Sequence, residues 1–366
     1  MTQKPPFADE IRKTGFVLEN RIAQQLKSAG WTVISNKYYV DDSEETVREI
    51  DLVAYRCTKV QHFDVYTTLI ISCKKSDANA WALLAREINL KDPNSDWWPL
   101  HAWSNDRALT YKLSEPAKAN RYHKRVSELG VKEALNDPSV EVFAYQEMDK
   151  VSGRPQNDKP IFSAVTSLMK AQAYELAALP GRKKSPSVYQ FNLLSVVDTD
   201  LVRLMFSDDE IVASSLETEH YLAGYIVRKR ETFSRIRFIR ADRFKSVLED
   251  YGRLHTANCT WFAEETDSFY DGLVKDSKRT QVLAEDFKKK VQYDIAVRVA
   301  RNYSEIGPVT VNWDANGDEV WVGVLFEEND IDKLNSDERL KKTVAKALKD
   351  VYRYEGKFTF GEDLPF

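Results

Sequence analysis

The sequence predicts a mixed α+β fold, in which helices flank a central sheet and a small α+β unit follows at the C-terminus. One observation is a helical periodicity over residues 8–29 that gives way to short apolar runs typical of strands. Another is a strong turn signal, Asn316-Gly317, between two apolar runs late in the chain. The chain has 366 residues, enough for two domains, and we expect them at 1–270 and 275–366.

The composition narrows the class of protein. A hydrophobic content of 43% supports a sizeable core, and a net charge of −4 argues against a protein that coats nucleic acid nonspecifically. Cys57, Cys73 and Cys259 lie far apart and form no CxxC pair, which suits a reducing cytoplasm. The five histidines are scattered and do not favour a zinc site. The chain lacks an apolar stretch of membrane-spanning length and a signal-peptide pattern, so we expect a cytoplasmic protein with no membrane partner.

The predicted first helix, residues 8–29, has apolar and small residues at spacings of three and four, and it ends at Gly30. Glu19 lies four residues after Gly15, at the margin of the apolar face. A carboxylate in this position is either a rim residue in solvent or a group aimed at a site on the neighbouring sheet. The helix alone leaves both interpretations open.

Two apolar runs, Ile50–Tyr55 and Leu69–Cys73, are typical of buried strands that pair as a hairpin. Asp51 lies at the start of the first run, and Lys74 follows the second. Side chains alternate across a strand, so Ser72 and Lys74 share a face that can also receive Asp51. A carboxylate and an ammonium group together on the rim of a sheet suit metal-dependent cleavage of a phosphodiester.

These segments together resemble the PD-(D/E)XK nuclease superfamily, nearest in pattern to Mrr-type restriction enzymes and Holliday-junction resolvases. The resemblance is carried by Glu19 in TGFVLENRIAQQLKSAGW, Asp51 in REIDLV and Lys74 in LIISCKKS, over roughly residues 8–90. The family's order is a helix with Glu, a strand with Asp, a strand with acid-x-Lys and then a helix. The resemblance implies a restriction-endonuclease-like sheet with insertions. Ser72 departs from the pattern, because the family carries its second acid there.

The resemblance implies a Mg²⁺- or Mn²⁺-dependent site. Asp51 would be the central metal ligand, with Glu19 and the backbone carbonyl of Cys73 beside it. Lys74 would hold the attacking water or stabilise the developing negative charge. Ser72 would contact a metal-bound water without bringing a charge. Mg²⁺ often takes only one or two carboxylates, with water and phosphate completing its shell, so the departure at Ser72 weakens the site without removing it.

Glu49 is a further candidate ligand. It precedes Asp51 by two residues, so both side chains point to the same face of a strand. Glu49 would then supply the charge that is missing at Ser72. The alternative is an exposed residue at the end of a strand.

The segment 228–245, RKRETFSRIRFIRADRFK, is the most basic part of the chain, with eight Lys or Arg against two acids. Arg235 and Arg237 share one strand face and Ile236 and Phe238 the other, which suits phosphate contact by the first pair. The alternative is a charged edge strand that resists aggregation. The candidate nucleic-acid contacts are Lys75, Arg228, Lys229, Arg230, Arg235, Arg237 and Arg240. We expect a nucleic-acid partner, with DNA favoured, and a homodimer is a further expectation.

Four other local predictions bear on the fold. Residues 38–46 are predicted to form a solvated acidic turn. A helix is expected to begin at Ser76, with Trp81 on its buried face. Residues 162–179 are predicted to be helical. The apolar segment 188–206 is broken by three polar residues and is predicted to form a hairpin.

Three interpretations of function follow. The first is a Mg²⁺-dependent DNA endonuclease of restriction, phage defence or repair. The second is a catalytically degenerate protein with the nuclease fold that binds nucleic acid or regulates, and Ser72 motivates it. In the third, Asp51 and Lys74 form only a structural ion pair in an α/β protein. Divalent-metal binding separates the first from the third, and binding without cleavage marks the second.

Overall fold

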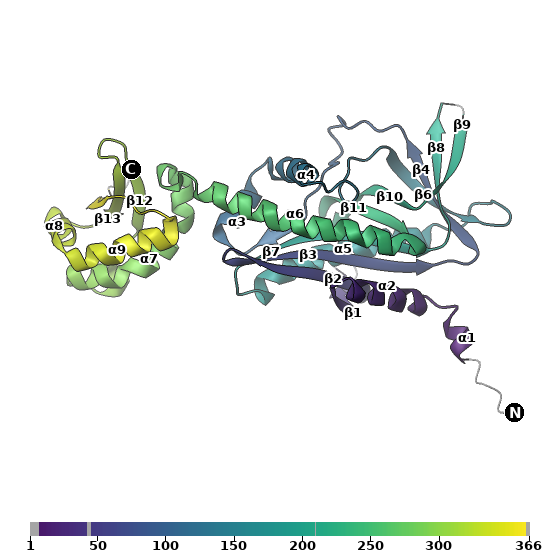
Figure 1. The fold of residues 1–366 in the computed structure, drawn as a ribbon, viewed down its shortest axis with the longest axis horizontal. Coiled ribbons are helices and arrows are strands. Elements are labelled where there is room, and N and C mark those ends of the chain that lie inside the picture. Colours follow the sequence, from purple (N-terminus) through teal and green to yellow (C-terminus); the bar gives the residue numbers. More distant parts are fainter. Residues whose placement is uncertain (1–6, 42–44, 209, 364–366) are drawn as a thin grey trace. The chain divides into compact units, whose positions relative to one another are not determined.

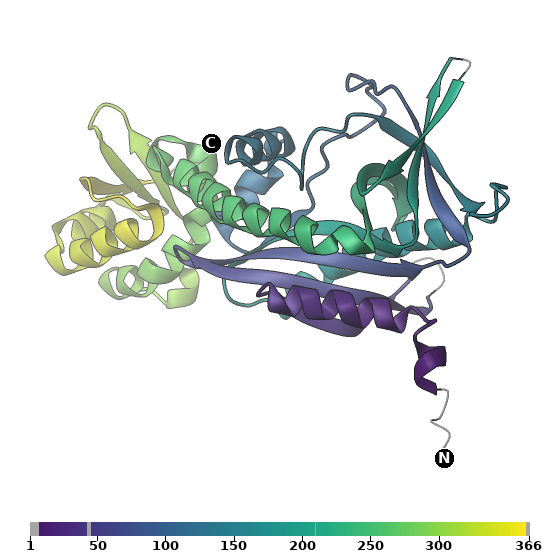
Figure 2. The same ribbon diagram turned by 45° about the vertical axis from the view of Figure 1, so that its right-hand side comes forward.

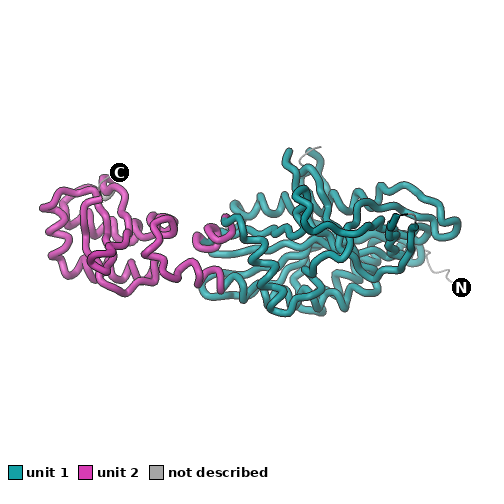
Figure 3. Tube along the Cα trace, turned by 90° about the horizontal axis from the view of Figure 1, so that it is seen from above, with its two compact units in different colours: residues 1–106, 115–263 teal, residues 107–114, 264–366 magenta. Residues whose placement is uncertain are grey.

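The computed structural model describes residues 7–41, 45–208 and 210–363, which form a mixed α+β fold. The chain divides into two compact units, which Figure 3 shows in different colours. Unit 1 comprises residues 1–106 and 115–263, and unit 2 comprises residues 107–114 and 264–366. Unit 2 therefore begins before the expected boundary at 275 and includes a short segment from the middle of the chain. No helix in the described ranges is long and apolar enough to cross a membrane.

Unit 1 is built on a seven-stranded mixed sheet (Figure 1). The first three strands form an antiparallel meander, and β3, β7 and β11 run parallel to one another. The predicted hairpin between Asp51 and Lys74 is confirmed, although both strands are longer than the apolar runs. In spatial order the strands are β1 (Thr32–Val40), β2 (Val47–Val60), β3 (Phe63–Lys75), β7 (Ser187–Asp198), β11 (Arg230–Arg240) and β10 (Thr218–Val227), with β5 (Ala102–Ser104) paired to β7.

Helices cover both faces of this sheet (Figures 1 and 2). On one face, Arg56 of β2 donates to the backbone carbonyl of Ala29 at the end of α2 (Phe16–Ser28) and lies against Gly252 of α6 (Phe244–Tyr270). Val53 of β2 points to the opposite face, where it shares a core with α5 (Lys159–Arg182). The predicted helix over residues 162–179 is confirmed within α5.

A second sheet of unit 1 corrects two predictions. Ser76 caps no helix: its Oγ accepts a hydrogen bond from the backbone N–H of Asn79, and a strand follows. The segment 188–206 forms no hairpin, because β7 lies in the first sheet and the strand after it in the second. Trp81 is buried as expected, but in a strand, where it donates to Glu147. The sheet order is β6 (Glu141–Asp149), β4 (Asn79–Arg86), β8 (Leu201–Ser207) and β9 (Glu210–Leu216).

The N-terminal segment differs from the prediction in two places. The expected single helix is divided into α1 (Phe7–Ile11) and α2, and the break falls before Gly15, a poor helix former. Gly30, with φ +79°, ends α2 as predicted. Asp41 is only 3% exposed and accepts from Lys170 at 2.9 and 3.0 Å, so its prediction as a solvated residue is wrong. Residues 42–44 of that turn lie outside the described residues.

The basic face of β11 is not open to solvent, so the expectation that it presents both cations to phosphate is wrong. Arg237 is 4% exposed, and its guanidinium pairs with Asp250 of α6 at 3.1 Å. Arg235 is partly buried and donates to the backbone carbonyl of Asn136. The helix that follows β11 and a distant loop cover this face, and an alternating pattern within one strand does not reveal either of them.

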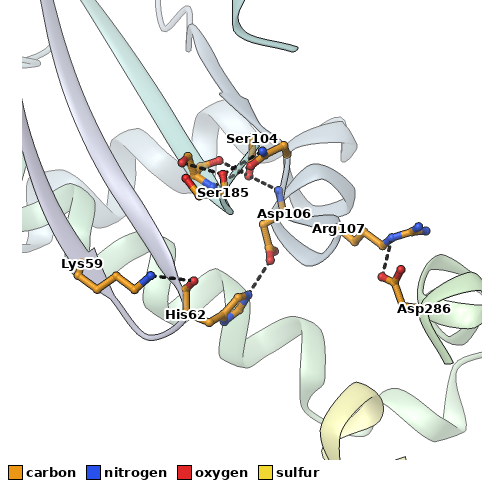
Figure 4. A network of polar contacts seen from close by, with 9 residues as sticks. Lys59, His62, Ser104, Asp106, Arg107, Ser185 and Asp286 are labelled. Carbon is orange, nitrogen blue, oxygen red and sulfur yellow. Dashed lines mark hydrogen bonds and ion pairs between the residues drawn. The ribbon is translucent and has the colours of Figure 1, made fainter. Parts of the chain in front are cut away.

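Unit 2 has a core of its own, formed by a three-stranded sheet and helices. The hairpin predicted around Asn316-Gly317 is confirmed. Arg107 of the early segment pairs with Asp286 at 2.7 Å, which holds that segment on a long helix of the same unit (Figure 4). The elements of unit 2 are α3 (Arg107–Ser114), η2 (Leu273–Lys275), α7 (Ser277–Arg298), η3 (Tyr303–Glu305), β12 (Val309–Asp314), β13 (Glu319–Val324), α8 (Glu328–Ser336), α9 (Glu338–Tyr352) and β14 (Phe358–Glu362), while α4 (Lys118–Glu128) and η1 (Ala241–Arg243) belong to unit 1.

The buried ion pair makes a first prediction. Asp250→Ala leaves the Arg237 guanidinium buried without its carboxylate, and it should cost about 3–5 kcal/mol of unfolding free energy. Asp242→Ala is the matched control, because Asp242 is 57% exposed and pairs with Arg240 of the same strand. That loss should be about 0–1 kcal/mol. Urea unfolding measures both variants, and equal losses would contradict the assigned roles.

The histidines make a second prediction. Burial lowers the pKa of His101, His123, His220 and His255, to about 4 for His123 and His255. The unfolded chain binds protons near pH 6.5 while the folded chain does not, so stability should fall as the pH drops from 6.5 to about 4. Urea midpoints across this range measure the loss. The slope should be smaller in His255→Gln, and an unchanged slope would count against the assignment.

Candidate functional site

The main sheet divides at Asp51, where β2 and β3 separate, and we call this point the fork. The β2–β3 ladder runs from Val60 and Phe63 to Leu52 and Ile71 and goes no further. Beyond it, residues 47–50 pair only with β1, and residues 72–75 pair only with β7. Asp51 is skipped in both registers of β2. The two strands therefore part at this residue, and its side chain lies in the opening.

The Asp51 carboxylate bridges the fork. Its Oδ2 accepts from the backbone N–H of Cys73 at 2.7 Å and from the Ser72 hydroxyl at 3.3 Å, and it lies 3.5 Å from Lys74 Nζ. In the described part of the chain, Oδ1 has no hydrogen-bond or ion-pair partner. The sequence predicted that these side chains share a face, and the structure brings them together.

Glu19 of α2 also faces the fork. Burial and the nearby Asp51 carboxylate raise its pKa, Lys74 lowers it, and Glu49 raises it further. Among the described residues its side chain has no hydrogen-bond or ion-pair partner. Two carboxylates that repel each other and hold unengaged oxygens are suited to a cation, which would relieve the repulsion.

Glu49 is exposed, and its carboxylate accepts a hydrogen bond from Asn36 Nδ2 at 2.6 Å. This engagement fits the interpretation of Glu49 as an exposed strand residue better than a role as ligand. Asn36 lies across from Asp51 in β1 and has a left-handed φ of +54°. Sequence reasoning missed Asn36, although asparagine is among the few residues that tolerate this conformation.

The donor set fits a hard cation such as Mg²⁺. No group of three or more His, Cys, Asp or Glu side chains within the described ranges is placed to hold a metal ion. Asp51 and Glu19 offer carboxylate oxygens, and the resemblance adds the backbone carbonyl of Cys73. Such a set suits an ion that keeps several waters and takes ligands from a substrate phosphate. Burial and the Asp51 carboxylate raise the pKa of the Cys73 thiol, which makes it a poor soft-metal ligand.

The register separates the candidate nucleic-acid contacts into two groups. Lys74 lies beside Val197, and Val197 lies beside Arg240, so Arg240 is on the same edge about 10 Å from Lys74. It pairs with Asp242 at 2.7 Å. Arg228, Lys229 and Arg230 are exposed, but they lie in and beside the turn that opens β11, some 33 Å from Arg240 along the strand. They are too far from the fork to hold the same phosphate.

Lys75 lies beside the fork but does not reach freely into solvent. Its Nζ is 3.4 Å from the Asp77 carboxylate and donates to the backbone carbonyl of Arg12 at 3.4 Å. Ion pairs of this exposed kind are weak, so a phosphate could exchange with Asp77. Lys75 therefore stays a candidate contact.

A basic groove of about 930 Å³ opens between α2 and α6. Arg21, Arg56, Lys245 and Arg253 line it, against the single acid Glu249. Arg21 also pairs with Asp198 at the end of β7. It lies near enough to Cys73 to oppose the rise in the pKa of that thiol, so this end of the groove lies beside the fork. Sequence reasoning missed the groove, because its cations come from three separate elements and form no local pattern.

Family models, curated proteins and solved structures were all compared with the chain, and none of them matches.

Ser72 makes a third prediction. Ser72→Asp places a second acid at the fork and should tighten Mn²⁺ binding roughly tenfold, because affinity rises with the charge of the ligands. Titration calorimetry measures the binding, and circular dichroism verifies the fold. Ser72→Ala is the control and should bind Mn²⁺ as the wild type does. A folded Ser72→Asp variant with unchanged affinity would show that position 72 does not face the metal.

Proposed function

We propose that this protein is a Mg²⁺-dependent endonuclease that hydrolyses phosphodiester bonds in DNA. One observation carries the proposal: Asp51 and Lys74 meet across a fork in the sheet, 3.5 Å apart, and Glu19 faces them from the preceding helix. An ion pair with a purely structural role would not need a second, unpartnered carboxylate beside it.

The order of the elements supports the same proposal. Helix α2 carries Glu19, β2 carries Asp51, and β3 carries the segment from Ser72 to Lys74. After an insertion, α5 crosses to β7, which pairs in parallel with β3. This is the order of the PD-(D/E)XK pattern that the sequence resembles, with the second sheet built largely from the insertion.

Each side chain has a role in the proposed reaction. Asp51 and Glu19 would hold the divalent ion, which when bound would neutralise the scissile phosphate and lower the pKa of a bound water. Lys74 stabilises the negative charge that develops on the phosphate or positions the attacking water. The Ser72 hydroxyl donates to Asp51, so it orients that carboxylate and contributes no charge.

The groove between α2 and α6 supports a nucleic-acid substrate. Arg21 lies in the middle of α2 and Lys245 at the start of α6, and η1 and α6 directly follow Arg240 of the fork's edge. Lys245 is exposed and has no ion-pair partner among the described residues. A phosphate backbone that entered this groove would meet cations from α2 and α6 and then the carboxylates of the fork.

Ser72 favours a second candidate function. Without the second acid, the same fold and groove would serve a protein that binds nucleic acid but does not cut it. The two candidates share a salt-dependent affinity for DNA and differ only in turnover.

The fourth prediction concerns the cleavage of plasmid DNA, measured in Mg²⁺ or Mn²⁺ with EDTA as the control. The wild type should cut, and Asp51→Asn and Lys74→Ala should each lose about 10²-fold or more in rate, because each removes charge from the reacting centre. Lys229→Ala is the matched control, since it removes an exposed cation remote from the fork. Variants that cut like the wild type would refute the site. A wild type that binds DNA without cutting would establish the second candidate.

A further inference from the structure

A buried cationic cavity lies in unit 1, among α4, β10 and β11, whose positions Figure 1 labels. His123 of α4, His220 of β10 and Arg235 of β11 line it, together with Arg237 and Tyr251. None of the fork residues takes part, so this cavity is separate from the proposed nuclease site.

Several of its nitrogen atoms are buried without a partner. Within the described ranges, both ring nitrogens of His123, Nδ1 of His220 and Nη1 of Arg235 make no hydrogen bond of normal geometry, although the backbones of Trp98 and Pro99 lie near enough to His123 to raise its pKa. His123 is only 8% exposed, and His220 uses its other nitrogen on the backbone carbonyl of Glu133. Nearly all buried polar atoms in folded proteins are hydrogen-bonded, so four such nitrogens around one cavity indicate a missing partner. Neutral His123 has one N–H to donate, whereas His220 already donates through Nε2, so its Nδ1 donates only when the ring is protonated, which a bound anion would favour.

The charge of Arg235 is also uncompensated. Its neighbour Arg237 pairs with Asp250, whereas Arg235 has no ion pair among the described residues, and Nη2 donates only to the carbonyl of Asn136. Burial lowers the pKa of Arg235 to about 10, although Tyr251 and Asp137 lie near enough to oppose the shift, and Arg237 contributes to it. An isolated buried charge is costly, so the cavity is suited to an anion.

A larger pocket at the surface adjoins the cavity. An outer pocket of about 740 Å³, lined by α4 and residues 127–137 with Trp98, shares His123 and Leu135 with the inner space of about 30 Å³. The outer volume is typical of a small-molecule site. The inner space has room only for a small group of atoms.

We propose that this pocket binds a small phosphate-bearing molecule. The phosphate is held by Arg235, His220 and His123, and the rest of the molecule occupies the outer pocket. Arg235 and the N–H of His123 are donors, and His220 becomes one when a bound anion favours its protonation. Groups that converge from three elements match a phosphate with several terminal oxygens better than a planar carboxylate with two. The site requires no metal and is independent of the proposed nuclease function.

The fifth prediction uses inorganic phosphate as the probe, in EDTA, with the full-length protein. Phosphate should raise the unfolding temperature of the wild type and shift the imidazole NMR signals of His123 and His220. Arg235→Met should lower the phosphate affinity at least tenfold, while Arg230→Met, at the exposed start of the same strand, should retain it. Without phosphate, Arg235→Met should unfold at the same temperature as the wild type or higher, because an unpaired buried charge is gone.

Two further arms decide the class of ligand. Equal protection of the wild type and Arg235→Met by phosphate would mean an adventitious ion only and would overturn the proposal. The absence of any effect of phosphate on the unfolding temperature would also overturn the proposal. Protection by acetate alone would overturn it as well and would indicate a ligand with a carboxylate. Arg237→Met should unfold at a lower temperature than the wild type without phosphate. If Arg235→Met were destabilised equally, Arg235 would be a structural residue.

Discussion

The candidate site depends on one constraint, the parting of β2 from β3 at Asp51. The β2 strand leaves to follow β1, and β3 leaves to follow β7. The backbone N–H of Cys73 then has no backbone carbonyl on β2 to bond to. The side-chain carboxylate of Asp51 accepts this hydrogen bond instead, at 2.7 Å. A buried N–H without an acceptor would be costly, so this carboxylate maintains the opening that it occupies. The same aspartate thus bonds the two parted strands to each other and is the group proposed to hold the metal.

The fork also explains why helices on opposite faces reach the same place. Glu19 approaches on α2, while Ser167 of α5 lines a small cavity against Asp51 and Ser72 from the other face. In a continuous sheet these two helices would be separated by a layer of backbone. The parted strands let groups from both faces of the sheet approach one carboxylate.

The sequence predicted the parts of this site that depend on local rules. Alternation along a strand placed Ser72 and Lys74 on one face, and the apolar runs predicted the hairpin that carries Asp51. The failures involve the packing of one element against another, which no local rule determines. Alternation cannot show that α6 covers Arg237, or that β7 and β8 enter different sheets, because a polar break after an apolar run allows either pairing. Glu19 could be placed on a helix but not against the fork, since that depends on how α2 packs.

The discontinuity of unit 2 has a consequence for the order of synthesis. Ala108 of α3 is 1% exposed in a core whose other members come from residue 269 onward. A growing chain therefore makes α3 long before the helices and strands that bury it, and residues 115–263 of unit 1 are translated in between. The apolar side of α3 therefore stays without its packing partners while β7 and β11 are synthesised and complete the main sheet. Unit 2 cannot finish folding as an independent C-terminal module, and a fragment that starts at residue 264 would lack one piece of its interior.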